Sequence, residues 1–481
     1  MKEETRPILS TKRSGRNVRV APLTALFLLM PGRKPKPPVA AKDLQGFKYF
    51  DMVRPLLQRL HDDGTAGDKA GNRQLFFDQY AALLLLYFFN PILTSFNGLR
   101  QATELAKVQK VLGTGRVSAG SLSEAQGVFN PALLEGLIAE LAERVAPVTP
   151  PKEWAALKDL VAVDGSLLPC CARMAWALWL DDAHKAAKMH VHFEVLRGIP
   201  VKVTVTAGNG SETEQLRRAL QKGRLYVIDR GYAEYQLFQD ILDAKSSFIG
   251  RIRDNAVWQV IEERPLTERD RAAGVVRDLV VWLGCDQSGA VFKQPLRVVE
   301  VHTGKTDANG KPEVLLLATD RMELAAELVA LGYRFRWPVE LFFRWFKCIL
   351  GRRHLLCESQ NGVTIQVYVA IIASLLLSLW VGKKPTKRTF EMFCLFFAGW
   401  ATEAELLAHI NKLQDAPKDS SYTVARMVIR HITQWDSIRP KNDIRLVLLR
   451  KKDLMMSMLF GSMPWGDDSS SQTGQAAQHS G

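Results

Sequence analysis

Two short acidic motifs of the sequence are candidates for holding a metal ion. Asp164 begins Asp-Gly-Ser and Asp229 begins Asp-Arg-Gly-Tyr. Each ends a short apolar run, Val161–Asp164 or Leu225–Ile228, that predicts a β-strand. Carboxylates at the ends of adjacent strands can converge, and Mg²⁺ accepts one or two of them while keeping positions for water and phosphate. A third carboxylate would complete a pair of such sites.

Glu340 is the candidate for the third carboxylate, in the stretch 333–347. On one continuous helix, at about 100° per residue, its face would span about 80° and include four more residues. They are Tyr333, Arg336, Arg344 and Lys347. An acid flanked by cations and a tyrosine is what a site needs to bind a metal and to grip a phosphodiester. The alternative is a solvated stripe of ion pairs at four-residue spacing.

The other side of this helix is apolar and is expected to pack in the core. Its residues are Leu341, Phe342, Trp345 and Phe346. Pro338 complicates a continuous helix, because proline prefers the first helical turn. A helix that starts near Trp337 would leave Tyr333 and Arg336 on an entering turn.

These residues resemble the DDE-type transposases of bacterial insertion sequences. Residues 333–347 match Tyr-x2-Arg-x3-Glu-x6-Lys, the signature of the subgroup named after that Y-R-E-K motif (insertion sequence family four). The motifs at Asp164 and Asp229 look like its first and second acidic motifs, and the β-rich segment before Glu340 matches the insertion of this subgroup. The resemblance covers about residues 70–410.

The resemblance implies an α/β fold with an RNase H-like mixed-sheet catalytic core. In that core Asp164, Asp229 and Glu340 would bind two Mg²⁺ or Mn²⁺ ions. The implied reaction cleaves DNA at the terminal inverted repeats of the element and joins the 3′ ends to target DNA by in-line phosphoryl transfer. The implied partners are double-stranded DNA and, in the synaptic complex, a second copy of the chain.

The same resemblance assigns further residues to DNA. Tyr333, Arg336 and Lys347 would hold phosphates near the transposon end, and Arg344 is a further candidate outside the motif. Arg230 and Tyr232 are expected beside the metal ligands. In some relatives a tryptophan of the insertion stacks on a flipped base. The insertion here contains Trp258 and Trp282, for which packing in the strand core is the expectation.

Two other functions remain open at this point. One is a catalytically silent DNA-binding protein derived from a transposase, against which the three intact acids argue. The other is a non-mobile nuclease with the same RNase H-like core. Inverted repeats beside the gene would separate these functions, because only a mobile element requires them.

The pattern of apolar residues divides the chain into seven segments. They are a basic arm (1–44), a helical DNA-binding domain (45–150), the first part of the catalytic core (151–255), a β-rich insertion (256–319), the remainder of the core with the Glu-bearing helix (320–382), a C-terminal helical region (383–460) and a disordered tail (461–481). In the helical domain, Ser121 and Glu124 have capping-box spacing before a candidate recognition helix, which suggests a helix-turn-helix.

Composition is consistent with a soluble DNA-acting protein. The 481 residues include 47% hydrophobic and 24% charged residues, and the net charge of +14 favours a polyanionic partner. Cys170 and Cys171 are adjacent, the other four cysteines are scattered and none forms a Cys-x-x-Cys pair, which indicates a reducing cytoplasm and no zinc site. The resemblance implies a bacterial protein associated with the nucleoid. The apolar runs Tyr80–Phe89 and Val367–Val381 are shorter than the ~20 residues of a membrane span, so we expect buried helices and no membrane.

Overall fold

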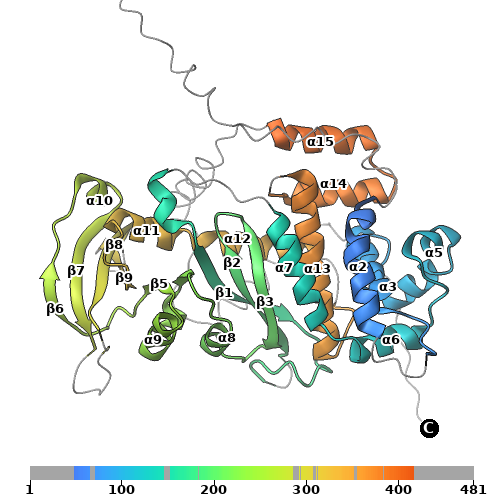
Figure 1. Ribbon diagram of the computed structural model, residues 1–481, viewed down its shortest axis with the longest axis horizontal. Coiled ribbons are helices and arrows are strands. Elements are labelled where there is room, and N and C mark those ends of the chain that lie inside the picture. The colour runs from blue at the N-terminus through green and yellow to red at the C-terminus, as the bar shows by residue number, and fades with distance from the viewer. Residues whose placement is uncertain are drawn as a thin grey trace, which may run out of the picture.

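The computed structural model describes residues 48–65, 71–145, 152–181, 184–284, 292, 294–306, 310, 312–350, 355–382 and 384–415. The expected basic arm and the expected tail lie outside the described residues. In Figure 1 the described chain forms a sheet with its flanking helices beside a largely helical part.

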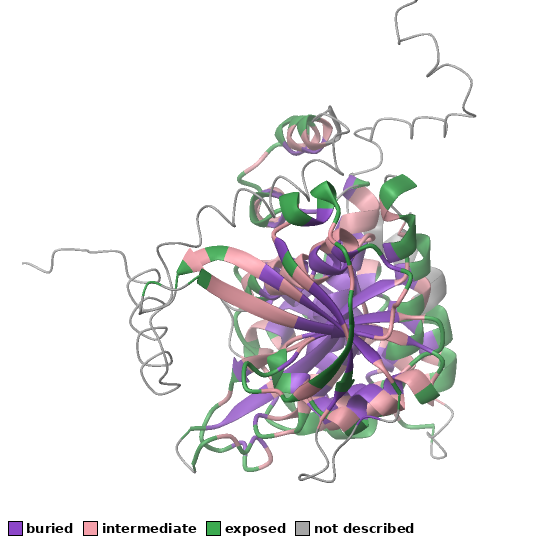
Figure 2. Ribbon diagram, turned by 90° about the vertical axis from the view of Figure 1, so that its left-hand side faces the viewer, coloured by how far each residue is buried: buried purple, intermediate pink, exposed green. Residues whose placement is uncertain are grey.

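Nine strands within the described residues form one mixed sheet, in the order β3-β2-β1-β4-β5-β9-β8-β7-β6. The strands are β1 (Leu160–Pro169), β2 (Ala186–Glu194), β3 (Ile199–Ala207), β4 (Leu225–Ile228), β5 (Ser247–Arg251), β6 (Trp258–Glu263), β7 (Val275–Leu283), β8 (Leu296–Thr306) and β9 (Pro312–Thr319). The expected mixed α/β architecture is therefore confirmed. Figure 2, seen from the β6 end, shows a buried centre of the sheet with more exposed helices around it.

The centre of the sheet is parallel. β4 pairs in parallel with β1 on one side and with β5 on the other. All four residues of β4 are buried, as expected for a parallel strand covered on both faces. β1, β2 and β3 form an antiparallel meander. His190 and His192 lie on β2 as core residues, and burial lowers the pKa of each imidazole, to about 4 and about 3, so both are neutral.

The insertion extends this sheet rather than forming a separate one, because β9 pairs antiparallel with β5. Its first two elements, β6 and α10 (Glu268–Ala272), have no counterpart in the expectations from sequence. Trp258 packs against the core of the insertion as expected, but Trp282 is 37% exposed, so the expectation of core packing is wrong for Trp282. Trp282 lies on β7 between Val281 and Leu283, which are buried, so its side chain is on the more exposed face of that strand.

Helices precede and follow the sheet. The first group comprises α2 (Lys48–Thr65), α3 (Phe77–Phe89), α4 (Phe96–Ala102), α5 (Ala106–Leu112), α6 (Ala119–Val128) and α7 (Ala132–Arg144). The capping box at Ser121 is wrong: α6 is capped by Ser118, whose extended backbone lets its hydroxyl accept a hydrogen bond from the Ser121 N–H, so Ser121 lies inside the helix. The C-terminal group comprises α13 (Gln360–Val381), α14 (Lys387–Phe397) and α15 (Glu403–Asp415).

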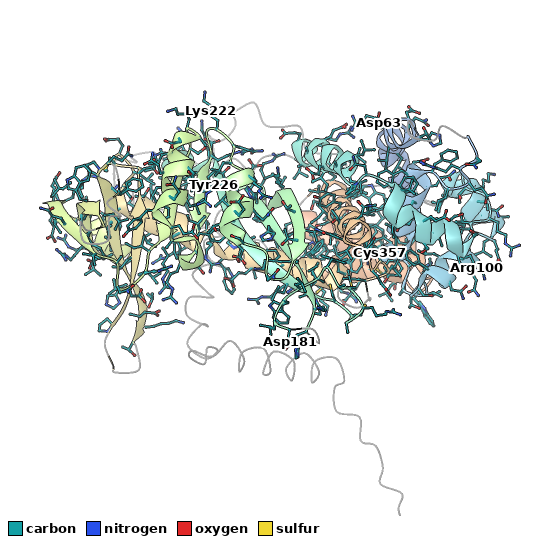
Figure 3. All side chains as sticks on the ribbon, turned by 90° about the horizontal axis from the view of Figure 1, so that it is seen from below. Asp63, Arg100, Asp181, Lys222, Tyr226 and Cys357 are labelled. Atoms are coloured by element: carbon teal, nitrogen blue, oxygen red, sulfur yellow. The ribbon has the colours of Figure 1, made fainter. Side chains whose placement is uncertain are left out.

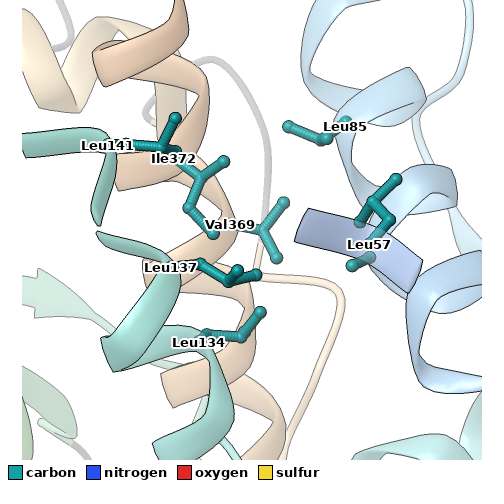
Figure 4. Close-up of a pocket in the computed structure, with 8 residues that line it drawn as sticks. Leu57, Leu85, Leu134, Leu137, Leu141, Val369 and Ile372 are labelled. Carbon is teal, nitrogen blue, oxygen red and sulfur yellow. The ribbon is translucent and has the colours of Figure 1, made fainter. Parts of the chain in front are cut away.

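Helix α13 is the centre of the helical part. It is 22 residues long and, by length and composition alone, long and apolar enough to cross a membrane. The expectation that its apolar run is too short for a membrane span is therefore wrong. However, 89% of its most apolar window is buried in the protein, against α3, α7 and β3. Figure 4 shows its aliphatic contacts with α2, α3 and α7 around a small apolar pocket.

Along the chain, two helices follow the last strand and precede α13: α11 (Ala326–Arg334) and α12 (Trp337–Leu350). The chain therefore breaks between Tyr333 and Glu340, and the single-helix prediction is wrong. The alternative is confirmed for the start of α12 at Trp337 and for Arg336, which lies in the turn before it. It is wrong for Tyr333, which lies in the last turn of α11. Helix α12 packs on β1, and the ring of Phe342 lies 5.3 Å from that of Phe193 on β2.

A buried ion pair fixes the insertion to the start of α11. Arg297 of β8 donates from Nε and Nη2 to the two carboxylate oxygens of Asp278, each at 2.7 Å, and both side chains are nearly inaccessible. Its third nitrogen, Nη1, donates to the carbonyl oxygens of Arg321, Met322 and Leu324, directly before α11. One arginine thus joins β7, β8 and the segment that leads to the site.

Replacement of Arg297 by alanine should destabilise the protein strongly, because it leaves the Asp278 carboxylate buried without a partner. We expect the free energy of unfolding in urea to fall by about 3–5 kcal/mol. Arg277→Ala is the matched control on the neighbouring strand. It removes an exposed pair with Glu263 and should cost less than about 1 kcal/mol. Equal losses in the two variants would contradict the structural role of Arg297.

Candidate active site

Two of the predicted acids lie at the same edge of the parallel sheet. Asp229 directly follows Ile228, the last residue of β4. Asp164 lies inside β1 rather than at its end, because β1 continues to Pro169 by pairing with β2. Its parallel pairing with β4 stops at Ala162, however. Both aspartates therefore come just after the paired part of their strands.

Arg336 brings the third acid to this edge. Its Nη2 donates to Oε1 of Glu340 at 2.7 Å, and its Nη1 lies 3.5 Å from Oδ2 of Asp164. The Tyr333 hydroxyl donates to Oδ1 of Asp229 at 2.9 Å. The junction between α11 and α12 thus contacts all three acids, although Tyr333 and Arg336 are not on the helix of Glu340.

The pKa values of the two aspartates are shifted in opposite directions from the ordinary value of an aspartate. Burial raises the pKa of Asp164 to about 7, and the nearby charges of Glu212 and Glu340 add to that rise, while Arg336 and the Gly165 N–H oppose it. Burial also acts on Asp229, but Arg336, the Arg230 N–H and the Tyr333 hydroxyl outweigh it and leave its pKa lowered. Asp229 is therefore the carboxylate that stays charged, and Asp164 is the one that holds a proton near neutral pH.

The remaining predicted residues lie around this centre in different ways. Arg344 and Lys347 are exposed on α12, and the Arg344 guanidinium stacks 5.0 Å from the Trp337 ring centre. Arg230 donates its backbone N–H to Asp229, but its side chain turns away to Asp254, 3.2 Å from Nη1. Tyr232 is buried, and the charges of Glu212, Asp164 and Asp229 add to burial in raising the pKa of its hydroxyl.

Sequence reasoning missed one acid and its partner. Glu212 is the first residue of α8 (Glu212–Arg218), and its Oε1 lies 3.3 Å from Nζ of Lys188 on β2. Ser211 caps this helix, with its hydroxyl accepting a hydrogen bond from the Glu214 N–H. The acid in its first turn is what a helix N-terminus usually carries, so this position gave no signal of a role at the site.

The residues of this centre fit a divalent cation in their chemistry. Among the described residues, no three Asp, Glu, His or Cys side chains are grouped closely enough to hold a metal, and the Arg336 guanidinium lies between Asp164 and Glu340. The donors are carboxylate oxygens, which Mg²⁺ and Mn²⁺ prefer.

Comparison with known proteins assigns this region to a family. Residues 155–376 match the family model described as the transposase DDE domain, and that span includes Asp164, Asp229 and Glu340. This part of the chain is therefore similar to the transposase DDE domain.

Its relatives are proteins named as transposases, from bacteria. A Sinorhizobium fredii protein named transposase y4zB is 28% identical over 218 residues, which are 45% of this chain and 59% of that protein. A Geobacillus stearothermophilus protein named as the transposase for insertion sequence element IS5377 is 29% identical over 221 residues, 45% of this chain and 55% of that protein. The resemblance to bacterial insertion-sequence transposases is confirmed, and the matched region spans less than two thirds of either relative.

A solved structure, the cryo-EM structure of a piggyBac transposase synaptic complex with hairpin DNA, covers 82% of this chain and 84% of its own. Sequence identity is 11% and the TM-score is 0.35, a value at which the likeness says nothing further about the fold.

The raised pKa of Asp164 predicts a dependence of stability on pH. Between its ordinary pKa of 3.8 and about 7, the folded protein holds a proton that the unfolded chain has lost. The free energy of unfolding should therefore decrease as pH rises through this window. In Asp164→Asn this decrease should be absent, and at about pH 8 the variant should be more stable by on the order of 1–3 kcal/mol.

Urea unfolding with EDTA across that pH range measures the effect. Asp243→Asn, at an exposed residue of α9 (Tyr235–Asp243), is the control and should keep the slope of the natural protein. The same slope in Asp164→Asn as in the natural protein would show that the proton is not on Asp164.

Proposed function

We propose that this chain is a transposase that cleaves DNA at the terminal inverted repeats of its insertion sequence and joins the 3′ ends to target DNA. The observation that carries the proposal is the convergence of Asp164, Asp229 and Glu340 at one edge of a parallel sheet, within the DDE domain. The Y-R-E-K spacing of residues 333–347 supports placing it in the subgroup of that name.

An RNase H-like core is supported by the sheet. The first five strands have the order β3-β2-β1-β4-β5, with β1, β4 and β5 parallel to one another and β2 antiparallel to its neighbours. In such a core the acids of the first and fourth strands meet beside a following helix. Here that helix is α12, which packs on β1 and carries Glu340.

Asp164, Asp229 and Glu340 would hold two Mg²⁺ or Mn²⁺ ions. When bound, such ions lower the pKa of water and stabilise charge on the scissile phosphate. Arg336 has to leave the space between Asp164 and Glu340 for this, and Asp164 has to release its proton. Asp229 is already held as a carboxylate, with the Tyr333 hydroxyl orienting one of its oxygens.

Double-stranded DNA is the proposed substrate, at the transposon ends and at the target. Tyr333, Arg336, Arg344 and Lys347 lie along the α11–α12 segment beside the acids, where they would contact phosphates. The helices before residue 150 would read the end sequence. Synapsis of two ends would need a dimer, and the reaction would take place in the bacterial cytoplasm, at the nucleoid.

Glu340→Gln should abolish cleavage and spare binding to the ends. The substitution keeps the side-chain size and removes the charge, so we expect cleavage of a plasmid carrying the element's own flanking DNA to fall at least about 100-fold. The assay compares Mg²⁺ with EDTA and maps the breaks. Glu323→Gln, at an exposed residue before α11, is the control and should cleave normally.

The outcomes separate the three candidate functions. Metal-dependent breaks at the element ends, lost in Glu340→Gln, support the transposase. Binding to the ends without breaks would favour a silent DNA-binding protein. Nicking at random positions would favour a non-mobile nuclease. Normal cleavage by Glu340→Gln would remove Glu340 from the catalytic acids.

Lys347→Ala should weaken binding to the transposon end and reduce its dependence on salt. Removal of one phosphate contact lowers the slope of log affinity against log salt by about 1. Binding is measured by fluorescence anisotropy at several salt concentrations. Lys222→Ala is the control, because Lys222 (labelled in Figure 3) precedes β4 and so lies at the opposite edge of the sheet from Asp229. An equal change of slope in both variants would contradict a specific contact by Lys347.

A further inference from the structure

Glu212 adds a fourth carboxylate to the acidic centre, although it belongs to neither acidic motif nor to the Y-R-E-K stretch. Its charge raises the pKa of Asp164 and of Tyr232, so it lies within electrostatic reach of both. Lys188 contacts its Oε1 at 3.3 Å and is itself held by the Gly210 carbonyl oxygen, 3.0 Å from Nζ. The carboxylate is therefore held in place beside Asp164.

The residue after Asp164 has to be small for this arrangement. A Cβ atom on Gly165 would lie 2.7 Å from Oε1 of Glu212, which is closer than van der Waals contact allows. The Glu212 carboxylate thus rests directly on the backbone of the Asp164 motif. The backbone of Gly165 is not in the left-handed region, so its conformation does not require glycine. What requires glycine here is the close approach of the Glu212 carboxylate.

A buried hydroxyl at the same place has no partner. Tyr232 is 2% exposed, and among the described residues its Oη makes no hydrogen bond. The charges of Glu212, then Asp164, then Asp229 act on it most strongly after burial. The Glu212 side chain also raises this pKa as a hydrogen-bond acceptor, so the hydroxyl faces Glu212 at or just beyond hydrogen-bond distance. A buried hydroxyl without a full hydrogen bond is costly, and a water between these acids would accept one from it.

We propose that Glu212 is a ligand of the same divalent cation as Asp164, and that Gly165 is glycine so that the two carboxylates can share it. This inference rests on the metal site of the proposed function. Among the described residues, Arg336 and Lys188 are the cations that contact these four carboxyl groups, so a divalent ion would neutralise negative charge that remains once Asp164 is ionised. Lys188 holds Glu212 while the ion is absent.

The test is Mn²⁺ binding by the full chain without DNA, followed by electron paramagnetic resonance of the free ion. Glu212→Gln keeps the shape of the side chain and should weaken Mn²⁺ binding by about 10-fold or more. Gly165→Ala should weaken Mn²⁺ binding similarly, because the added Cβ would push the Glu212 carboxylate away from Asp164. The fold should be kept, since the atom that this Cβ meets is the end of a flexible side chain. Glu214→Gln, two residues along α8 and paired with Arg217 and Arg218, is the matched control and should bind as the natural protein does.

Asp164→Asn separates failure of this inference from failure of the proposed function. Weakened binding in Asp164→Asn, Glu212→Gln and Gly165→Ala, with normal binding in Glu214→Gln, supports the inference. Loss in Asp164→Asn with normal binding in Glu212→Gln overturns the inference and leaves the metal site intact. Absence of Mn²⁺ binding by the natural protein, or equal weakening in Glu214→Gln, overturns it as well. Thermal unfolding of each variant shows that it is folded. If Glu212→Gln is not folded, Mn²⁺ binding by Gly165→Ala decides the question.

Discussion

The contact of Arg336 with Asp164 and Glu340 is the interaction on which the acidic edge depends. Carboxylates brought together repel one another, and burial adds a penalty for each charge. Arg336 offsets part of this penalty: its guanidinium is only 12% exposed, and Asp229, Glu340, Tyr333 and Asp164 together raise its pKa despite burial. Without a cation at this position, burial and the charge of Glu340 would raise the pKa of Asp164 still further.

The break between α11 and α12 is what allows Arg336 to reach these acids. In a continuous helix, the direction of the Arg336 side chain would be fixed relative to that of Glu340. Because Arg336 lies in the turn, its side chain can point to the sheet. The aromatic face of α12 fixes the other partner. Phe342 and Phe346 are buried, with ring centres 5.7 Å apart, and they hold the helix against β1 so that Glu340 faces Arg336.

The sequence predicts the local elements of this site better than their contacts. β4 and Asp229 follow from a four-residue apolar run and the turn after it, and Pro338 indicates where α12 begins. β1 extends past Asp164 because β2 pairs with it along its length, which no local pattern reports. Glu212 is absent from the prediction for the same reason. It lies against Gly165 and Lys188 of β2, and almost fifty residues of chain separate it from Asp164. Trp282 shows that an aromatic residue on a strand need not be buried, because its neighbours in the sequence do not report what packs on its face of the sheet.

Under the proposed function, the same guanidinium has to change partners when the site is loaded. A divalent ion between Asp164 and Glu340 replaces the charge of Arg336, and a DNA phosphate at the same edge offers Arg336 a new anion. Each event makes the other more favourable, since a displaced arginine without a phosphate, or a phosphate beside unneutralised carboxylates, carries an electrostatic cost. Cation and DNA would therefore bind with positive coupling: Arg336 would stabilise the acids of the free protein, and bound DNA would strengthen the binding of the cation.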